Sequence, residues 1–265
     1  MSRRALVLPL LPLAIVLLGM IDPPVTLYLA GDSTMAQKLA GRRPETGWGE
    51  KLQQYFDIDQ VRVENYARNG RSTRTFISEG RWQAIVDRLR PGDYVFVQFG
   101  HNDESPDKVD RYTPPDDFRR NLARFVTDVH HRKATPVLLT PVQRRKFDAA
   151  GNLVDTHGQY SDLVRAVAAE LHVPLIDLQQ RSGEILARYG ADGSRQLFLQ
   201  LAPAENPNYP QGVQDNTHFS PLGAELVARA AAEGIAALDM PLAKLVRLPA
   251  PSAAAAAAPS PLPAR

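Results

Sequence analysis

The chain of 265 residues contains no cysteine. This absence excludes disulfide bonds, thiolate metal ligands, a cysteine nucleophile and a lipidated N-terminal cysteine. An excess of charge of one sign is also missing, because 31 lysines and arginines are balanced by 29 aspartates and glutamates. Such a weak overall field gives no reason to expect a nucleic acid or an acidic membrane surface as a partner.

Motifs for metals and nucleotides are absent as well. The sequence has no His-Glu-x-x-His motif, no carboxylate cluster and no glycine-rich motif of the Walker or dinucleotide type. The adjacent His130 and His131 fall at the end of a predicted helix, where imidazoles are usually solvated or interact with the helix dipole. The residues therefore indicate neither a metal site nor a nucleotide site.

One long apolar run occurs, over Ala5–Met20, and it follows two arginines. It is shorter than the roughly 20 residues that a membrane-spanning helix needs, and a short basic segment before an apolar run is typical of a signal peptide. We expect residues 1–22 to form a cleaved signal peptide, with a retained N-terminal anchor as the alternative, and the protein to be exported to the periplasm or the medium. Residues 244–265 are rich in proline and alanine and predict a flexible tail. One folded domain, residues 23–243, remains between these ends.

Within that domain, short apolar segments alternate with longer segments of helical periodicity. The apolar segments are rich in β-branched or aromatic residues and are bounded by Gly, Pro or Asp, as buried strands are. They cover Val25–Ala30, Val61–Tyr66, Tyr94–Phe99, Pro136–Thr140 and Val173–Asp177. The helical segments cover Trp48–Phe56, Phe76–Leu89, Asp116–Arg132, Tyr160–Leu171 and Pro221–Leu238. This alternation predicts a three-layer α/β domain with a parallel five-stranded sheet between two layers of helices.

Four short polar motifs fall at the ends of predicted strands or before a predicted helix. Ser33 follows the first strand within Gly-Asp-Ser-Thr, Gly70 follows the second within Asn-Gly-Arg-Ser, and Asn102 follows the third within Gly-His-Asn-Asp. Asp215 and His218 lie in a predicted turn that leads into the last helix. Right-handed crossovers place the loops after parallel strands on one rim, where ligands of α/β proteins bind. We therefore expect these residues to meet at that rim.

These residue types suit nucleophilic attack on an ester. A serine hydroxyl such as that of Ser33 becomes a nucleophile when a base within hydrogen-bond distance takes its proton, and the histidine His218 suits that role. A carboxylate on the other ring nitrogen, for which Asp215 is the candidate, fixes the tautomer and stabilises the imidazolium. The N–H groups of Ser33 and Gly70 and the amide of Asn102 could donate to an oxyanion.

In this order, the four motifs resemble the four sequence blocks of the SGNH (GDSL-type) hydrolases. Longer segments resemble the rhamnogalacturonan acetylesterase family in particular: Leu-Ala-Gly-Asp-Ser-Thr-Met, Gly-Trp-Gly-Glu, Gly-Arg-Ser-Thr-Arg-Thr-Phe, Glu-Gly-Arg-Trp and Gly-Asp-Tyr-Val-Phe-Val-Gln-Phe-Gly-His-Asn-Asp. The resemblance runs from about Val25 to Asp239. It implies a flavodoxin-like strand order and no metal or organic cofactor. It also implies the site residues: a catalytic triad of Ser33, His218 and Asp215, and an oxyanion hole of Ser33, Gly70 and Asn102.

The function that this resemblance implies is the removal of acetyl groups from a cell-wall polysaccharide by a serine esterase. Rhamnogalacturonan is the expected acetylated substrate, and we expect the enzyme to be a monomer. A lipase, thioesterase or acyltransferase of the same superfamily is the alternative, and a lipid substrate would predict a wide apolar cleft. A binding module without catalysis is a third hypothesis. Residues 202–214, which lead into the Asp-His motif, align with no pattern and leave the exact sugar open.

Other polar and aromatic residues near the rim allow two interpretations each. Asp32 and Asp103 could be a carboxylate pair for glycosidic cleavage, but we interpret them as acceptors that tie the rim loops together. Trp48 and Trp82 could stack on sugar rings, although buried packing is the simpler interpretation. The basic segment 144–146 is interpreted as a solvated loop, with contact to an acidic polysaccharide as the alternative.

Overall fold

Five short apolar segments pair into one parallel sheet in the computed structural model, which describes residues 23–249. The predicted signal peptide or anchor, and all but the first residues of the predicted tail, lie outside the described residues. The strands are β1 (Val25–Gly31), β2 (Val61–Asn65), β3 (Tyr94–Gln98), β4 (Thr135–Leu139) and β5 (Leu175–Ile176). All five begin within two residues of the predicted segments, and the expected α/β fold is confirmed.

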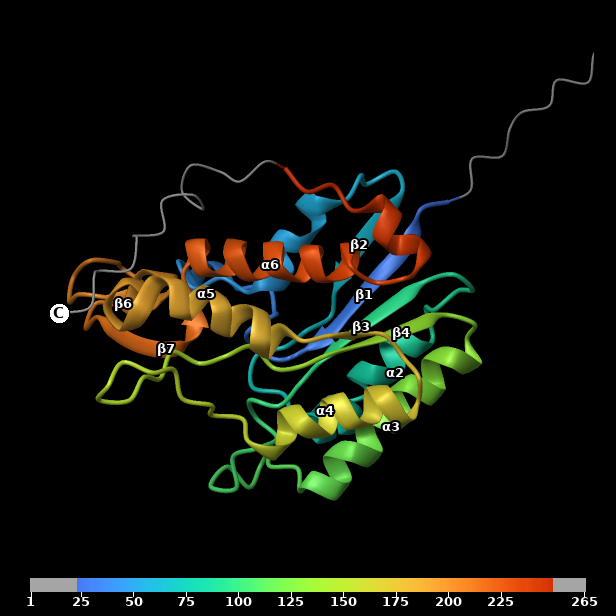
Figure 1. The fold of residues 1–265 in the computed structure, drawn as a ribbon, viewed down its shortest axis with the longest axis horizontal. Helices are drawn as coiled ribbons and strands as arrows, with labels where there is room; N and C mark the ends of the chain where they lie inside the picture. The colour runs from blue at the N-terminus through green and yellow to red at the C-terminus, as the bar shows by residue number, and fades with distance from the viewer. Residues whose placement is uncertain (1–22, 250–265) are drawn as a thin grey trace, which may run out of the picture.

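Alternation of side chains along the strands builds a separate core on each face of the sheet. On β1, Leu27 and Leu29 join one buried cluster, whereas Tyr28 and Ala30 join the other. Both faces are covered because a parallel sheet needs helices on each side. Figure 1 shows these two layers, with α5 (Leu178–Gly193) and α6 (Pro221–Ala236) on one face and with α2 (Arg81–Val86), α3 (Pro115–His131) and α4 (Gln159–Glu170) on the other. The result is the predicted three-layer architecture.

The order of strands in the sheet is β2-β1-β3-β4-β5. The chain therefore moves outward from β1 to β2 and then crosses back to place β3 on the other side of β1. The connections that follow β1 and β3 therefore run in opposite directions across the sheet. At such a point an open α/β sheet has a crevice at the carboxyl ends of the two strands, and ligands bind there. The ends of β1 and β3 carry the Ser33 and Asn102 motifs, so the topology brings both to this crevice.

Two predicted helices have a different form in the structure. The segment predicted as a helix over Trp48–Phe56 is a 3-10 helix, η2 (Trp48–Tyr55). The segment predicted over Phe76–Leu89 is divided into α1 (Thr73–Ser78) and α2 by Gly80, which has a φ of 70°. A glycine adopts this left-handed conformation without steric cost and so ends the first helix.

Three elements near the end of the chain were not predicted. They are helix α5 and the antiparallel pair β6 (Phe198–Leu201) and β7 (Val213–Phe219). Asp215 and His218, predicted in a turn that leads into the last helix, lie within β7, where the strand is irregular. Helix α5 contains Gly183 and Gly190, and because glycine has a low helix propensity its sequence gives a weak helical signal. Gly190, with a φ of 66°, also kinks the helix.

The folded part of the chain also continues past the predicted boundary at residue 243. Leu245 and Val246 pack against the buried cluster that contains α6, and the N–H of Arg247 donates to the carbonyl of Tyr55 at 2.8 Å. Residues 245–247 of the predicted tail therefore contact the folded domain, whereas Lys244 is exposed. None of the helices within residues 23–249 has the length and apolar character needed to cross a membrane.

Candidate active site

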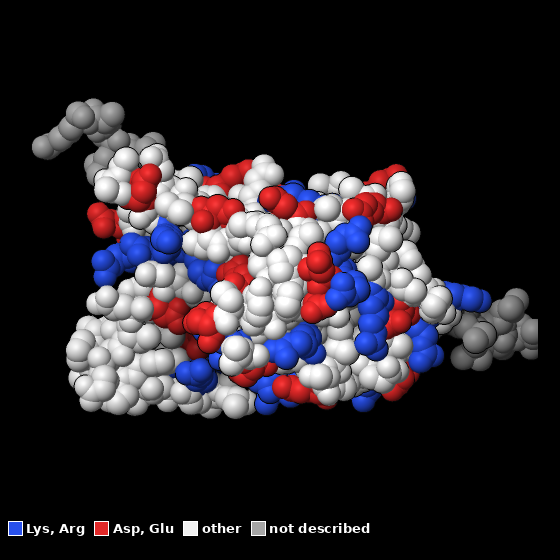
Figure 2. Space-filling view, turned by 90° about the horizontal axis from the view of Figure 1, so that it is seen from below, with Lys and Arg blue, Asp and Glu red and all other residues white. Residues whose placement is uncertain are grey.

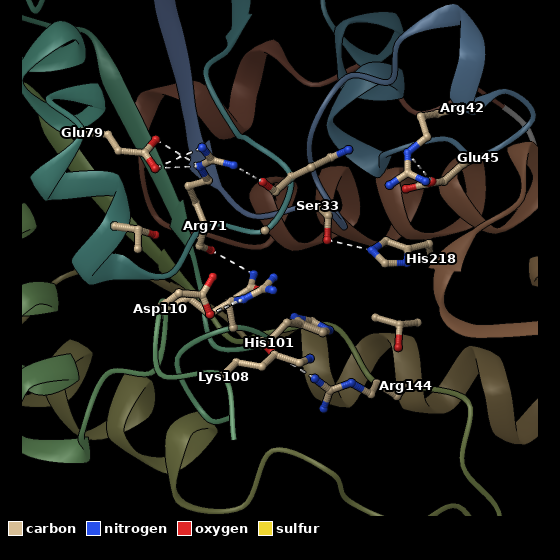
Figure 3. A pocket seen from close by; sticks show the side chains of 16 residues that line it. Ser33, Arg42, Glu45, Arg71, Glu79, His101, Lys108, Asp110, Arg144 and His218 are labelled. Carbon is tan, nitrogen blue, oxygen red and sulfur yellow. Dashed lines mark hydrogen bonds and ion pairs between the residues drawn. The ribbon is translucent and has the colours of Figure 1, made fainter. Parts of the chain in front are cut away.

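Three side chains from two distant segments form a continuous hydrogen-bonded chain at the rim. His218 Nε2 lies 2.8 Å from Ser33 Oγ, and His218 Nδ1 lies 2.7 Å from Asp215 Oδ2. Figure 3 shows the Ser33 hydroxyl directed at the imidazole across the pocket. The structure thus brings together the serine, histidine and aspartate that the sequence predicts.

An irregularity in β7 directs Asp215 and His218 to the same side. A regular strand would point residues three apart to opposite faces, but the pairing of β6 with β7 shifts register between Phe198 and Gln200. Within this bulge Asp215 Oδ1 accepts hydrogen bonds from the N–H groups of Thr217 and His218, at 2.7 and 2.9 Å. The resulting turn lets the other oxygen of Asp215 reach the imidazole, which is how a bulge can re-aim side chains beside a site.

Arg145 anchors this bulge to the body of the domain. Its N–H donates to the Asn216 carbonyl and its guanidinium donates to Asn216 Oδ1, both at 2.9 Å. The same guanidinium reaches the Ser194 hydroxyl and the Ala191 carbonyl at the end of α5. The interpretation of segment 144–146 as a solvated loop is therefore wrong for Arg145, although Lys146 is exposed.

Hydrogen bonds keep the Asp215 carboxyl ionised. Partial burial opposes its ionisation, but the hydrogen bonds from the His218 ring and from the backbone of His218 and Thr217 outweigh burial and lower its pKa to about 2. An ionised carboxylate at this place holds the proton of His218 on Nδ1 and leaves Nε2 free to accept one.

Candidate oxyanion donors surround Ser33. Among residues 23–249, the N–H groups of Ser33 and Gly70 make no hydrogen bond to another protein group. Gly70 has a φ of 75°, a conformation that strains residues with a side chain. Asn102 Nδ2 uses one proton for the Arg71 carbonyl at 3.0 Å, which leaves its second N–H for a ligand. The three predicted donors therefore line one pocket with free N–H groups.

A buried lysine connects the Ser33 turn to the loop that carries Gly70. The Lys38 ammonium donates to the Ser33 carbonyl and to Asn69 Oδ1, the latter at 2.9 Å, and pairs with Glu45 at 2.7 Å. Its side chain is fully buried, so its three protons satisfy three acceptors away from water. Burial lowers the pKa of Lys38, and the contact with Glu45 opposes this shift.

Two buried carboxylates support the rim from below. Asp32 Oδ1 accepts from the N–H and hydroxyl of Thr34 at 2.9 and 2.8 Å, and its Oδ2 faces His101 Nδ1 at 3.3 Å. Burial lowers the pKa of His101 to about 4. Burial opposes the ionisation of Asp32, but His101 and Thr34 outweigh it and lower the Asp32 pKa to about 2. Asp103 Oδ1 accepts from the N–H and hydroxyl of Thr73, at 2.9 and 2.6 Å.

These contacts settle the open interpretations of the sequence. Asp32 and Asp103 have no exposed surface, so they connect loops and cannot act as a pair on a sugar. Trp48 and Trp82 are also fully buried, and their indole N–H groups donate to Gln98 and Asp128. Their interpretation as packing residues is confirmed.

The pocket above Ser33 has a volume of about 690 Å³ and is lined without a single apolar side chain. Its walls include cationic side chains that the sequence analysis did not assign to the site, namely Arg42, Arg71, Lys108, Arg111 and Arg144. Arg144 is tied to Glu104 and to the His101 carbonyl, so it is part of the wall and not of a solvated loop. On the face drawn in Figure 2, basic and acidic side chains are interspersed, so charge of one sign forms no continuous patch there.

Residues 29–226, most of the folded chain, match the GDSL-like lipase/acylhydrolase family. The chain belongs to this family. It is 43% identical over 223 residues to the rhamnogalacturonan acetylesterase RhgT of Bacillus subtilis (strain 168), a match that covers 84% of this chain and 94% of RhgT. It is 36% identical to the probable rhamnogalacturonan acetylesterase YesY of the same organism, over 83% and 96% of the two chains. As a member of this family, the protein is a carboxylic ester hydrolase.

Solved structures share the fold of this esterase. The crystal structure of YxiM from Bacillus subtilis superposes with a TM-score of 0.69 at 27% identity, over 80% of this chain and 56% of that chain. The acetylxylan esterase Axe2 of Geobacillus stearothermophilus gives a TM-score of 0.58 at 21% identity, over 81% and 95%. These superpositions confirm the predicted fold class of the domain.

Sequence reasoning missed the supporting residues because their signals are dispersed. Lys38 and Glu45 fall in a loop without a motif, and Arg111 lies in a polar segment before α3. Only the fold shows that they reach the rim. Within residues 23–249, the active site included, no cluster of three or more His, Asp or Glu forms a group that could hold a metal ion.

We predict that Lys38→Met destabilises the domain, because it leaves the Glu45 carboxylate buried without its partner. Removing one member of a buried ion pair costs about 3–5 kcal/mol of unfolding free energy, which urea unfolding measures. The double variant Lys38→Met/Glu45→Gln should recover part of the loss, and the exposed Lys146→Met is the control. A loss below about 1 kcal/mol in the single variant would contradict the role assigned to this pair.

We predict a pH-dependent stability that originates at Asp103. Burial raises the pKa of this carboxyl to about 7 from its ordinary value of 3.8. The folded state therefore keeps a proton that the unfolded chain releases above pH 4. Stability that is present below pH 4 is thus lost as the pH rises toward 7, by at most about 1.4 kcal/mol per pH unit.

In Asp103→Asn this decrease should disappear, whereas Asp110→Asn, at an exposed carboxylate, should keep it. Unfolding free energies measured in urea between pH 4 and 8 give the comparison. Parallel pH curves for the wild type and Asp103→Asn would show that Asp103 ionises normally.

Proposed function

We propose that the protein is a serine esterase that removes acetyl groups from rhamnogalacturonan, with Ser33 as the nucleophile. The observation that carries this proposal is the hydrogen-bonded chain from Ser33 through His218 to Asp215, with both distances below 3 Å. The two acetylesterase relatives of more than one third identity support the choice of substrate.

In the first half of the reaction, Ser33 Oγ attacks the carbonyl carbon of the acetyl ester. His218 Nε2 takes the hydroxyl proton, and the ionised Asp215 stabilises the imidazolium that forms. The carbonyl oxygen becomes an oxyanion, which the N–H groups of Ser33 and Gly70 and the Asn102 amide bind. Collapse of this intermediate breaks the bond to the sugar oxygen, and His218 gives that oxygen its proton.

In the second half, water enters in place of the sugar. His218 takes a proton from the water, which attacks the acetyl carbon on Ser33, and the same donors bind the second oxyanion. Release of acetate returns the proton to Ser33 Oγ. Each step is carried by side chains and N–H groups of this chain, together with the substrate and one water molecule.

The polar and charged lining of the pocket favours a sugar substrate over a lipid. Long acyl chains bind in apolar clefts, because burial of each CH₂ contributes about 0.8 kcal/mol. The residues that line this pocket are polar, charged or glycine. A lipase or thioesterase with a long acyl chain would leave that chain against polar groups, and the short acetyl group avoids this cost.

The same proposal includes the setting in which the enzyme acts. A polysaccharide substrate lies outside the cell, which agrees with export by residues 1–22, either as a cleaved signal peptide or as a retained anchor. Nucleophile, base and oxyanion donors all come from one chain. A monomer is therefore sufficient for activity.

We predict that Ser33→Ala lowers acetate release from acetylated rhamnogalacturonan by at least about 10⁴-fold, because the covalent route is lost and only binding and the oxyanion hole remain. Asp215→Asn should lower kcat by about 10⁴-fold through the wrong histidine tautomer. Acetylated xylan and p-nitrophenyl esters of increasing chain length test the substrate class.

Arg132→Gln, an exposed change at the far end of α3, is the matched control and should keep full activity. Near wild-type turnover in Ser33→Ala would contradict the mechanism. A preference for long acyl chains would contradict the substrate class and leave the mechanism intact.

A further inference from the structure

Arg111 lies at the edge of the oxyanion site. Its Nη1 is 3.4 Å from Asn102 Oδ1, and a Cβ placed on Gly70 would lie 3.3 Å from the same nitrogen. The guanidinium therefore stands beside two of the three candidate oxyanion donors. It comes from the loop between β3 and α3, and its side chain is 30% exposed to the pocket and the solvent.

Arg71 and Arg144, two other arginines of the pocket, are already well paired. Arg71 donates to both carboxylate oxygens of Glu79 from Nε, at 3.1 and 3.0 Å, and to the Asn69 carbonyl at 2.9 Å. Arg144 pairs with Glu104 and also donates to the His101 carbonyl. Figure 3 shows the Arg71–Glu79 pair on one wall of the pocket and Arg144 on another. These two guanidinium groups act as wall elements with few free donors.

Among residues 23–249, Arg111 has no comparable partner. Its contacts are Asn102 Oδ1 and Asp110 Oδ1, both at 3.4 Å, and the Asp110 side chain is 73% exposed to water. A guanidinium carries five N–H donors, so most of them are left for a ligand. Lys108, which lines the same wall, forms no ion pair within residues 23–249. The pocket as a whole holds five Lys and Arg side chains against three carboxylates.

We propose that Arg111 is a specificity-determining residue, which binds the carboxylate of a uronic acid in the acetylated chain and so makes the esterase prefer acidic over neutral substrates. This inference rests on the proposed function and names the group that the site recognises. The planar guanidinium matches a carboxylate through two parallel hydrogen bonds. Because Arg111 stands beside Asn102 and Gly70, the carboxylate belongs to the acetylated sugar or to its neighbour. Lys108 adds a second positive charge at the rim.

Arg111 also contributes to the orientation of Asn102, and this second role needs its own readout. Arg111 can only donate and the Arg71 carbonyl can only accept, so together they fix which end of the Asn102 amide faces which partner. Loss of this positioning effect would lower the rate for every ester. Loss of carboxylate binding would lower it only for acidic substrates, mainly through KM.

The experiment compares two substrates that differ in the carboxylate alone. One is a rhamnogalacturonan oligosaccharide that is chemically acetylated, and the other is the same acetylated oligosaccharide with its carboxyl groups activated by carbodiimide and reduced to alcohols after acetylation, so that no new acetyl ester is introduced. The full-length wild type, Arg111→Gln, Arg111→Lys and Arg132→Gln are assayed for acetate release at low and high salt. Arg132→Gln removes the same charge far from the pocket and is the control.

For Arg111→Gln we expect the ratio of kcat/KM on the acidic substrate to that on the reduced substrate to fall by about 10- to 100-fold, the size of a lost charge-assisted hydrogen bond. The ratio for Arg111→Lys should lie between that of Arg111→Gln and that of the wild type, because lysine keeps the positive charge but cannot form two parallel hydrogen bonds to a carboxylate. The acidic preference of the wild type should weaken in high salt. Arg132→Gln should keep the wild-type ratio.

Two results would overturn the inference. Equal kcat/KM on both substrates in the wild type would show that no carboxylate is recognised. An equal loss of kcat/KM on both substrates in Arg111→Gln would show that Arg111 only orients Asn102. In both cases acetate is still released, so the proposed function stands. If the wild type releases acetate from neither oligosaccharide but hydrolyses p-nitrophenyl acetate, the proposed substrate is wrong and the inference falls with it.

Discussion

The hydrogen bond between His218 and Ser33 joins two segments that are 185 residues apart in the chain. Ser33 is fixed at the carboxyl end of a central strand, whereas His218 depends on a small antiparallel sheet outside the main one. The position of His218 is set by the bulge in β7, by Arg145, which binds Asn216 next to it, and by the N–H of Thr46, which donates to the Phe219 carbonyl at 3.0 Å. A shift of any of these supports would separate base from nucleophile, and a misplacement of about 1 Å can cost 10²-fold in rate.

Beneath the reacting atoms, the rim is held by buried polar side chains in place of apolar packing. Lys38 links the carbonyl of Ser33 to Asn69, and Asp103 links the loop after β3 to Thr73 at the start of α1. Lys38 has an acceptor for each of its three protons, whereas Asp103 Oδ2 is buried without a hydrogen-bond partner within residues 23–249. Buried polar groups are costly where they are not fully paired, but their hydrogen bonds restrict the arrangement of the loops. The esterase therefore gains fixed oxyanion donors from groups that contribute little net stability. The same loops bring Gly70 and Asn102 to the lining of the pocket, while Ser72, Thr73 and Asp103 beside them remain buried.

Much of this arrangement could be predicted from the sequence, because strands and motifs are local signals. The five strands follow from β-branched runs bounded by turn residues, and Ser33, Gly70, Asn102, Asp215 and His218 follow from their places at strand ends and before a helix. The form of the Asp-His segment could not be predicted, since pairing of β7 with β6 and the bulge depend on contacts distant in sequence. Lys38 and Arg111 were missed, and Arg144 was interpreted as part of a solvated loop, for the same reason: charged residues in loops are usually solvated, and only tertiary structure places these at the pocket.

The most direct test of the account is covalent labelling of the reactive hydroxyl. A fluorophosphonate forms a bond from Ser33 Oγ to phosphorus, with fluoride as the leaving group, only where a base activates the serine. Intact-mass and peptide analysis of the wild type should show a single adduct, located on Ser33, and His218→Ala should label at least about 10³-fold more slowly. Adducts on other residues, or equal labelling of both proteins, would contradict the claim that His218 activates Ser33.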